Sequence, residues 1–338
     1  MENLTHSLAG YALARAGLDR FSPRAAVLLV LAANAPDLDI VFLTQGPLRY
    51  FEAHRGYSHS VLLAPFLALL AVVVTAAIFR QRLPWFKAWL ICCLGVASHL
   101  IIDWTNNYGV RLALPFSSRW YHADLNSLYD VWILLALLFG AIWPLFSRLV
   151  SSEIGARMKT QRGSAIFALG FFLAFDCGRA FLHNQALRQL ESRLYDGTQP
   201  LKSAAFPDPF SPIHWTGAVE TERAFLTLPV DSLSDLDVAD AITFYKPDIT
   251  PLLPAVKSRP EFAYLSYFAR FPVWSVAPLG TGNGEGKRVE LTDLRFGTPG
   301  AGAFHSVATV DPAGRVRGSW FTYGSGREFG WQLGPEAH

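Results

Sequence analysis

Four long runs of apolar residues dominate the first half of the chain. The clearest run, residues 60–79, has 20 residues without a charge, which is the length a helix needs to cross the hydrocarbon core of a bilayer. Runs with few charges also cover residues 85–104, 130–147 and 164–183. Only helices and closed barrels satisfy their backbone polar groups inside lipid. The chain is therefore predicted to be mainly α, with a polytopic membrane helix bundle.

Two earlier segments, residues 4–18 and 25–43, are weaker candidates because the first is short and the second contains Pro36. The loop charges favour counting both as spans, with six in total and the N-terminus on the outer side. The inner loops and their flanks then hold Arg15, Arg20, Arg24, Arg80, Arg82, Lys87, Arg148, Arg157, Lys159 and Arg162. The outer loops, residues 44–58 and 105–129, hold Arg49, Arg55, Arg111 and Arg119. This asymmetry is the one that the positive-inside rule requires.

The composition agrees with a membrane protein. The chain is 51% hydrophobic and 17% charged, whereas soluble domains carry about 25% charged residues. The net charge of +2 gives no reason to expect a nucleic-acid partner. The three cysteines all lie inside apolar runs, so no disulfide framework is predicted.

The second half of the chain has the composition of a soluble protein. The predicted membrane-embedded domain, residues 1–183, is followed by an amphipathic helix and a linker over residues 184–215. Residues 216–338 contain short runs such as RFPVWSVAP, KRVELTDLRFG, FHSVATVD and RVRGSWFTYG between Gly, Asp-Pro and Asn-Gly turns. This pattern predicts a small β-rich domain on the outer side of the membrane.

Seven histidine and aspartate residues lie in or beside the apolar segments. An ionisable side chain at membrane depth is costly, so it normally faces an interior site and has a partner. Imidazole and carboxylate groups bind divalent metals, and thiols are absent from this set, so one or more metal ions are predicted, with zinc expected. In the six-span arrangement all seven lie toward the outer side. They are His6, Asp37, Asp39, His54, His59, His99 and Asp103.

Two pairs of these residues have informative spacing. His99 and Asp103 are four residues apart, so they share one helix face and can chelate a metal, or form a buried hydrogen bond instead. Asp37 and Asp39 would diverge on a regular helix. Pro36 disrupts the helix just before them and lets both carboxylates point inward. A helix-end cap is the alternative for this pair.

The segment HRGYSHS, residues 54–60, places His54 and His59 on either side of a glycine turn. Arg55 is suited to pair with a phosphate or carboxylate oxygen of a substrate. A chance pair of loop histidines is the alternative. His6 stands near the start of an apolar helix among small residues that allow close packing.

Further candidates lie beside the last two predicted spans. Asp130 begins the fifth span and is a candidate metal ligand, whereas His122 and Asp124 are equally explained as loop residues. On the sixth span Asp176 and Arg179 share a face with His183. They form either an internal ion pair or a substrate-binding site in which Arg179 holds the substrate.

The motifs THSLAG, PDLD, HRGYSHS and HLIID occur in this order, followed by a Tyr-Gly turn and a helix start at Asp130. Over about the first 150 residues this series resembles the YdjM-like family of bacterial inner-membrane proteins, described as metal-dependent hydrolases. That family is distantly similar to the zinc-dependent phospholipase C and single-strand nuclease superfamily. The resemblance implies metal ligands at His6, Asp37, His59, His99 and Asp103. It implies further ligands or supporting groups at Asp39, His54 and Asp130.

These observations favour a hydrolase of the bacterial inner membrane that acts on a phosphoester or related ester of a lipid or envelope component. In this hypothesis the metal activates a water, Asp39 or Asp37 accepts the proton, and Arg55 holds the anionic group. The rival is a non-catalytic metal-binding sensor or scaffold whose outer domain binds a partner. Both need a ligand cluster, so both stay open. Transport is disfavoured because the ionisable residues lie at one depth.

Overall fold

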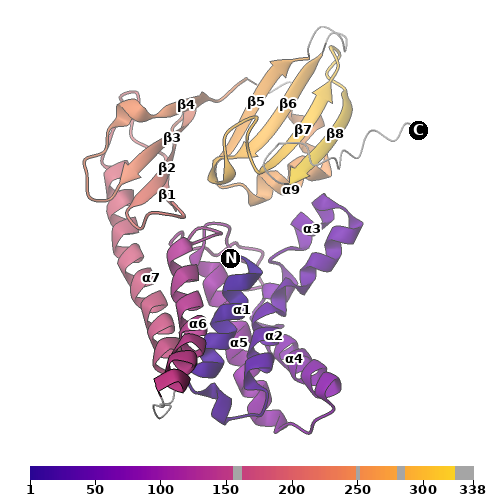
Figure 1. Ribbon diagram of the computed structural model, residues 1–338. Coiled ribbons are helices and arrows are strands. Elements are labelled where there is room, and N and C mark those ends of the chain that lie inside the picture. Colours follow the sequence, from indigo (N-terminus) through magenta and orange to yellow (C-terminus); the bar gives the residue numbers. More distant parts are fainter. Residues whose placement is uncertain (155–161, 249–251, 280–285, 324–338) are drawn as a thin grey trace. The chain divides into compact units, whose positions relative to one another are not determined.

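The computed structural model describes residues 1–154, 162–248, 252–279 and 286–323 (Figure 1). The chain divides into two compact units, and each is made of separate stretches of sequence. The helical unit contains residues 1–42, 53–184 and 207–214. The C-terminal unit contains residues 43–52, 185–206 and 215–338. A short stretch near the start of the chain therefore belongs with the end of the chain.

The helical unit is built from α1 (Asn3–Arg15), α2 (Ala25–Asn34), α4 (Ala64–Phe79), α5 (Trp85–Thr105), α6 (Val131–Ile154) and most of α7 (Arg162–Glu191). Short 3-10 turns η1 (Leu18–Arg20), η2 (Pro36–Gln45) and η3 (Tyr57–His59) join some of them. Two of these helices have a proline at or next to their first turn. Pro65 lies in the first turn of α4 and Pro84 directly precedes α5. The first turn of a helix tolerates proline because its N–H groups have no partner within the helix.

Three helices are long and apolar enough to cross a membrane, namely α5, residues 131–150 of α6, and α7. Two bent pairs qualify as broken spans: α2 with η2, bent by 47°, and the segment Pro47–His59 with α4, bent by 90°. The described residues therefore offer three to five spans, and the prediction of six is too high. The first predicted span is the 13-residue α1, which is only about 20 Å long.

Two groups of buried side chains hold the helices together. One joins α2, α4 and α5, and the other joins α1, α5, α6 and α7. Small residues allow close approach where α1 meets α2. A Cβ atom built on Gly10 would lie 2.6 Å from the Leu29 carbonyl oxygen. Such contacts between small residues are typical of helices packed inside a membrane.

Replacing Gly10 with alanine is expected to destabilise the protein, because the new methyl group meets backbone rather than a movable side chain. Overpacking of this kind costs about 1–3 kcal/mol. Gly178 on α7 is a matched control, since nothing lies within 4 Å of its added Cβ. There alanine should be neutral or stabilising by about 0.5–1 kcal/mol. Thermal unfolding in detergent measures both, and a Gly10→Ala variant as stable as Gly178→Ala would contradict the packing.

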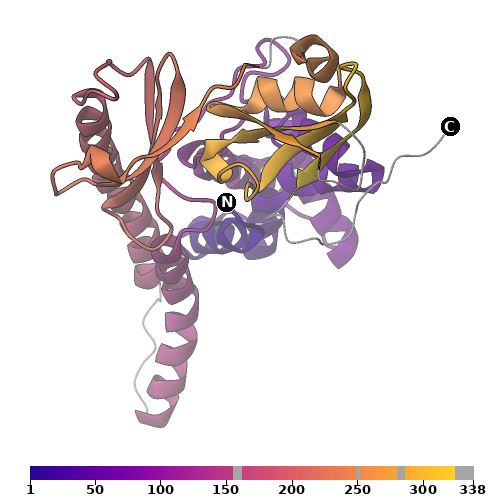
Figure 2. The same ribbon diagram turned by 90° about the horizontal axis from the view of Figure 1, so that it is seen from above.

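The C-terminal unit contains two four-stranded sheets, ordered β1-β2-β3-β4 and β5-β6-β7-β8. Neighbouring strands of the second sheet are antiparallel, and α9 packs on one face of it (Figure 2). The first sheet consists of β1 (Lys202–Pro207), β2 (His214–Glu220), β3 (Ala224–Asp231) and β4 (Ile242–Tyr245). The second consists of β5 (Pro272–Pro278), β6 (Lys287–Asp293), β7 (Phe304–Val310) and β8 (Val316–Tyr323). The C-terminal unit also contains three short helices, which are most of α3 (Pro47–Ala53), α8 (Leu253–Lys257) and α9 (Pro260–Phe268). It contains two 3-10 turns as well, η4 (Val238–Asp240) and η5 (Leu294–Phe296).

The four strands expected from the runs between residues 270 and 324 are confirmed as β5 to β8. Residues 184–191 are helical, as expected, and continue α7 without a break. One other expectation is wrong, because residues 202–207 form a strand where a linker was predicted. Phe206 explains this error. Its side chain is buried among residues of both sheets, a tertiary contact that local composition does not reveal.

Candidate metal centre

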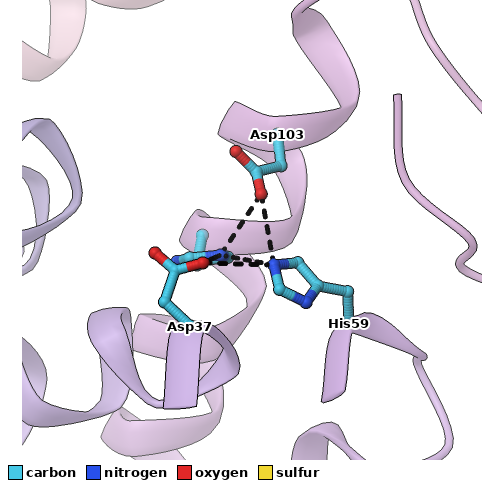
Figure 3. Close-up of side chains that lie close together, drawn as sticks. Asp37, His59 and Asp103 are labelled. Carbon is cyan, nitrogen blue, oxygen red and sulfur yellow. Dashed lines mark hydrogen bonds and ion pairs between the residues drawn. The ribbon is translucent and has the colours of Figure 1, made fainter. Parts of the chain in front are cut away.

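Four of the predicted ligands converge on one point in the helical unit. Asp37, His59, His99 and Asp103 each offer a ligand atom, and all four atoms lie within 4.8 Å of one another. The Nε2 atom of His59 lies 3.5 Å from the Asp37 carboxylate and 3.3 Å from that of Asp103. Figure 3 shows these three side chains pointing toward one another from separate segments. The group is buried except for part of Asp37.

Local structure explains how the chain brings these residues together. His99 and Asp103 lie one turn apart on α5, and their side chains meet at 3.3 Å, as the spacing predicts. After α2, Pro36 begins the 3-10 segment η2, which carries Asp37 and Asp39. Because this segment is not a regular α-helix, both carboxylates reach the site despite their spacing of two residues.

The two imidazole rings face each other with their Nε2 atoms, 3.1 Å apart. His99 Nδ1 lies 2.7 Å from the Ala33 carbonyl oxygen, which only accepts, so Nδ1 carries the proton. Ser58 Oγ donates to Asp39 and accepts from His59 Nδ1, which therefore also carries its proton. In neutral rings both Nε2 atoms then present lone pairs to the same space, beside two carboxylates. This donor set fits a divalent metal, whose histidine ligands donate their other N–H to such partners.

A second group lies beside the first and shares Asp37 with it. Asp37, Asp39 and His54 also offer ligand atoms within 4.8 Å of one another. His54 Nδ1 lies 3.0 Å from Asp39 Oδ1. Asp37 is therefore common to two groups, each of which could hold a metal ion.

Arg55 is buried at the edge of the site, with only 3% of its surface exposed. Its guanidinium donates to Asp103 at 3.1 Å through Nη2, and to Asn106 and Gly109 through Nη1. Its backbone N–H donates to Asp39 at 3.1 Å. The Arg55 backbone has a φ of 53°, a left-handed conformation that is uncommon for a residue other than glycine. Arg55 thus orients carboxylates of both groups.

The structure places His6 beside the site but outside both groups. Its ring stacks on His99, with 3.8 Å between centroids, and its Nε2 atom lies 3.4 Å from Asp103. The amino group of Met1 forms an ion pair with the same carboxylate. Asp103 therefore receives contacts from the two imidazoles of its own group, from His6, from Met1 and from Arg55.

The structure does not bring Asp130 and Arg179 into either group. Instead they form a buried ion pair at 3.0 Å, and Arg179 also donates to the Asp208 carbonyl. Asp176 accepts a hydrogen bond from Asn126 at 2.8 Å. In the loop, His122 pairs with Asp124 at 3.3 Å. These contacts give Arg179 a stabilising role, and its predicted contact with a substrate stays a prediction.

Replacing Arg179 with methionine is expected to destabilise the protein by about 3–5 kcal/mol, because it leaves the Asp130 carboxylate buried without its partner. The pair lies outside both ligand groups, so the metal content should not change. Thermal unfolding and elemental analysis of the same preparation test both statements. A variant that keeps its stability but loses metal would move Asp130 and Arg179 into the metal site.

Sequence reasoning missed three residues that hold the ligands. Ser58 links His59 to Asp39, as described above. Asn106 is fully buried, and its Oδ1 accepts from Arg55 and from the backbone N–H of Tyr108. The Tyr108 ring lies under the Arg55 guanidinium, 4.7 Å from it. The only sequence signal for Asn106 is its place three residues after Asp103, where the helix ends.

The fold and the site define a helical membrane protein with a buried His/Asp cluster that has the ligand chemistry of a metal centre. The chain belongs to the YdjM inner membrane protein family, whose family model matches residues 1–186. It is also similar to an uncharacterized protein, YfhP of Bacillus subtilis (strain 168). The two are 24% identical over 333 residues, which cover 95% of this chain and 94% of that protein. No solved structure matches the chain.

Proposed function

We propose that the protein is a metal-dependent hydrolase that acts on a phosphoester or related ester of a lipid or another envelope component. The observation that carries this proposal is the pair of imidazole Nε2 lone pairs that face one space between the carboxylates of Asp37 and Asp103. In two neutral rings with protonated Nδ1 atoms, these lone pairs 3.1 Å apart repel each other unless a metal ion or a shared proton lies between them. Imidazole and carboxylate donors fit a divalent transition metal, and we expect zinc.

The ligands differ in how exposed they are to solvent, and this difference supports a catalytic position at one edge of the site. His59, His99 and Asp103 are fully buried, whereas the side chains of Asp37 and His54 are 13% and 12% exposed. A catalytic site differs from a structural one in keeping one coordination position open to water or substrate. We place that position on the side of Asp37, Asp39 and His54, which is the side a substrate can reach.

Within this proposal the side chains have separate tasks. A divalent ion supplies Lewis acidity, which makes water acidic enough to react near neutral pH. Asp39 would accept the proton of the attacking water, because hydrogen bonds from His54, Arg55 and Ser58 hold its carboxylate in one orientation. Arg55 holds Asp103 in place and adds positive charge beside the developing anionic oxygens.

The substrate class follows from location. A site at the outer face of the inner membrane would meet lipid head groups and envelope intermediates. The outer location is a proposal that depends on the distribution of arginine and lysine among the loops.

Elemental analysis of detergent-purified protein, followed by a hydrolysis screen on phospholipids and soluble phosphodiesters, tests the function. We expect at least one equivalent of metal, hydrolysis of one substrate class, and loss of both after treatment with a chelator. Metal-free protein with full activity would overturn the proposal. Protein that holds its metal and hydrolyses neither class would instead be a sensor or scaffold.

A further inference from the structure

The segment between the two halves of the site belongs to the C-terminal unit. Asp39 precedes residues 43–52, His54 and Arg55 follow them, and all three lie in the helical unit. Residues 43–52, which include most of α3, are part of the C-terminal unit instead. The chain therefore leaves the helical unit just after one ligand and returns to it just before the next.

Phe51 fixes this segment within the C-terminal unit. Its side chain is fully buried. It contacts four aromatic rings, with centroid distances between 4.7 and 5.5 Å. The hydroxyl of Tyr264 also donates to the Glu52 carbonyl oxygen at 3.2 Å. These four rings, which come from α9, β7 and β8, belong to Tyr264, Phe268, Phe304 and Phe321.

The connection from Phe51 to the ligands is short and has little slack. His54 is three residues after Phe51, and an extended chain spans at most about 3.6 Å per residue. The residues before and after segment 43–52 are hydrogen-bonded to each other, because the Asp39 carboxylate accepts from His54 Nδ1 and from the Arg55 N–H. The turn from Ala53 to Gly56 is tight, because a Cβ atom built on Gly56 would lie 2.7 Å from the Ala53 carbonyl oxygen. A shift of α3 must therefore move Ala53, His54 or Arg55.

We propose that Phe51 is a positioning residue, through which the C-terminal unit sets the geometry of His54 and Arg55. The inference rests on the proposed function, since it assigns the C-terminal unit control over the accessible half of the metal site. His59 and His99 are not part of the segment between Asp39 and His54, and they are held by Ser58 and Ala33. Loss of the Phe51 contacts therefore acts first on His54 and Arg55, and through them on Asp39 and Asp103.

The test compares Phe51→Ala with Phe271→Ala in the full-length protein. Phe271 is an equally buried phenylalanine of the C-terminal unit, and it packs between the two sheets rather than against α3. Phe51→Leu, which keeps an apolar side chain, and Tyr264→Phe, which removes the hydroxyl that donates to Glu52, provide milder changes. Hydrogen–deuterium exchange of residues 53–56 in metal-free protein is the first readout, and zinc affinity is the second.

We expect Phe51→Ala to raise exchange at residues 53–56 and to weaken zinc binding by about 10- to 100-fold, the usual effect of losing a group that holds a ligand. Phe51→Leu should restore part of both, Tyr264→Phe should show a smaller effect in the same direction, and Phe271→Ala should leave both unchanged. Parental exchange and affinity in Phe51→Ala, or equal changes in Phe271→Ala, would overturn the inference. A parent that binds no zinc would end the proposed function, and the exchange measurement would still decide this inference.

Discussion

Replacing His99 with alanine is expected to weaken metal binding by more than about 100-fold, because even the loss of a group that only orients a ligand costs 10- to 100-fold. His99 supplies one of the two imidazole donors, and its Nδ1–H bond to Ala33 fixes which nitrogen faces the site. Removing the ring also opens the space in which His6 stacks. The measurement is elemental analysis after gel filtration, combined with a zinc-competition titration.

His122→Ala is the matched control for this experiment. His122 also pairs with a carboxylate, that of Asp124, but it lies outside both ligand groups. The control should keep the full metal content of the parent. A His99→Ala variant with parental stoichiometry and affinity would show that the facing imidazoles hold no ion.

Exchanging Arg55 for lysine is expected to lower the hydrolysis rate by about 10- to 150-fold, the factor that corresponds to losing a charge-assisted hydrogen bond worth about 1.5–3 kcal/mol. The guanidinium contacts Asp103 through one nitrogen, and Asn106 and Gly109 through another. A lysine ammonium is a single point charge and cannot make both sets of contacts. The loss should appear in kcat, with the fold and most of the metal retained.

Arg119→Lys serves as the control, because Arg119 lies in the loop between α5 and α6 and its backbone and side chain make no contact with the ligands among the described interactions. Its rate should equal that of the parent. Parental rates in Arg55→Lys, on a substrate that the parent clearly hydrolyses, would remove Arg55 from the catalytic hypothesis.

The sequence predicts those parts of the site that depend on local spacing. His99 and Asp103 sit four residues apart on one helix, and the helix period alone brings them together. The break at Pro36 likewise indicated that Asp37 and Asp39 could both turn inward. The roles of Ser58 and Asn106 could not be predicted in this way. A side chain that orients a ligand needs only one hydrogen bond, and many polar residues at many spacings can supply it.

The fold was predicted less well than the site, for two physical reasons. The loop charges favoured counting residues 4–18 as a span, but loop charges cannot show that the helix there, the 13-residue α1, is too short to cross the bilayer. Residues 43–52 were expected to be a simple outer loop. Their place in the C-terminal unit depends on rings such as that of Tyr264, whose contact with Glu52 joins residues 212 positions apart. The residues near Glu52 in the sequence give no indication of a contact with a residue so far along the chain.

The division of the C-terminal unit among three stretches of chain has a consequence for biogenesis. A ribosome makes residues 43–52 well before the rings that enclose Phe51, which belong to a helix and strands much later in the chain. The segment cannot complete its packing until Phe321 has been synthesised. The region around His54 therefore matures only after β8 has been made, and a chain that stalls after α7 carries every ligand of the cluster without the packing that surrounds Phe51.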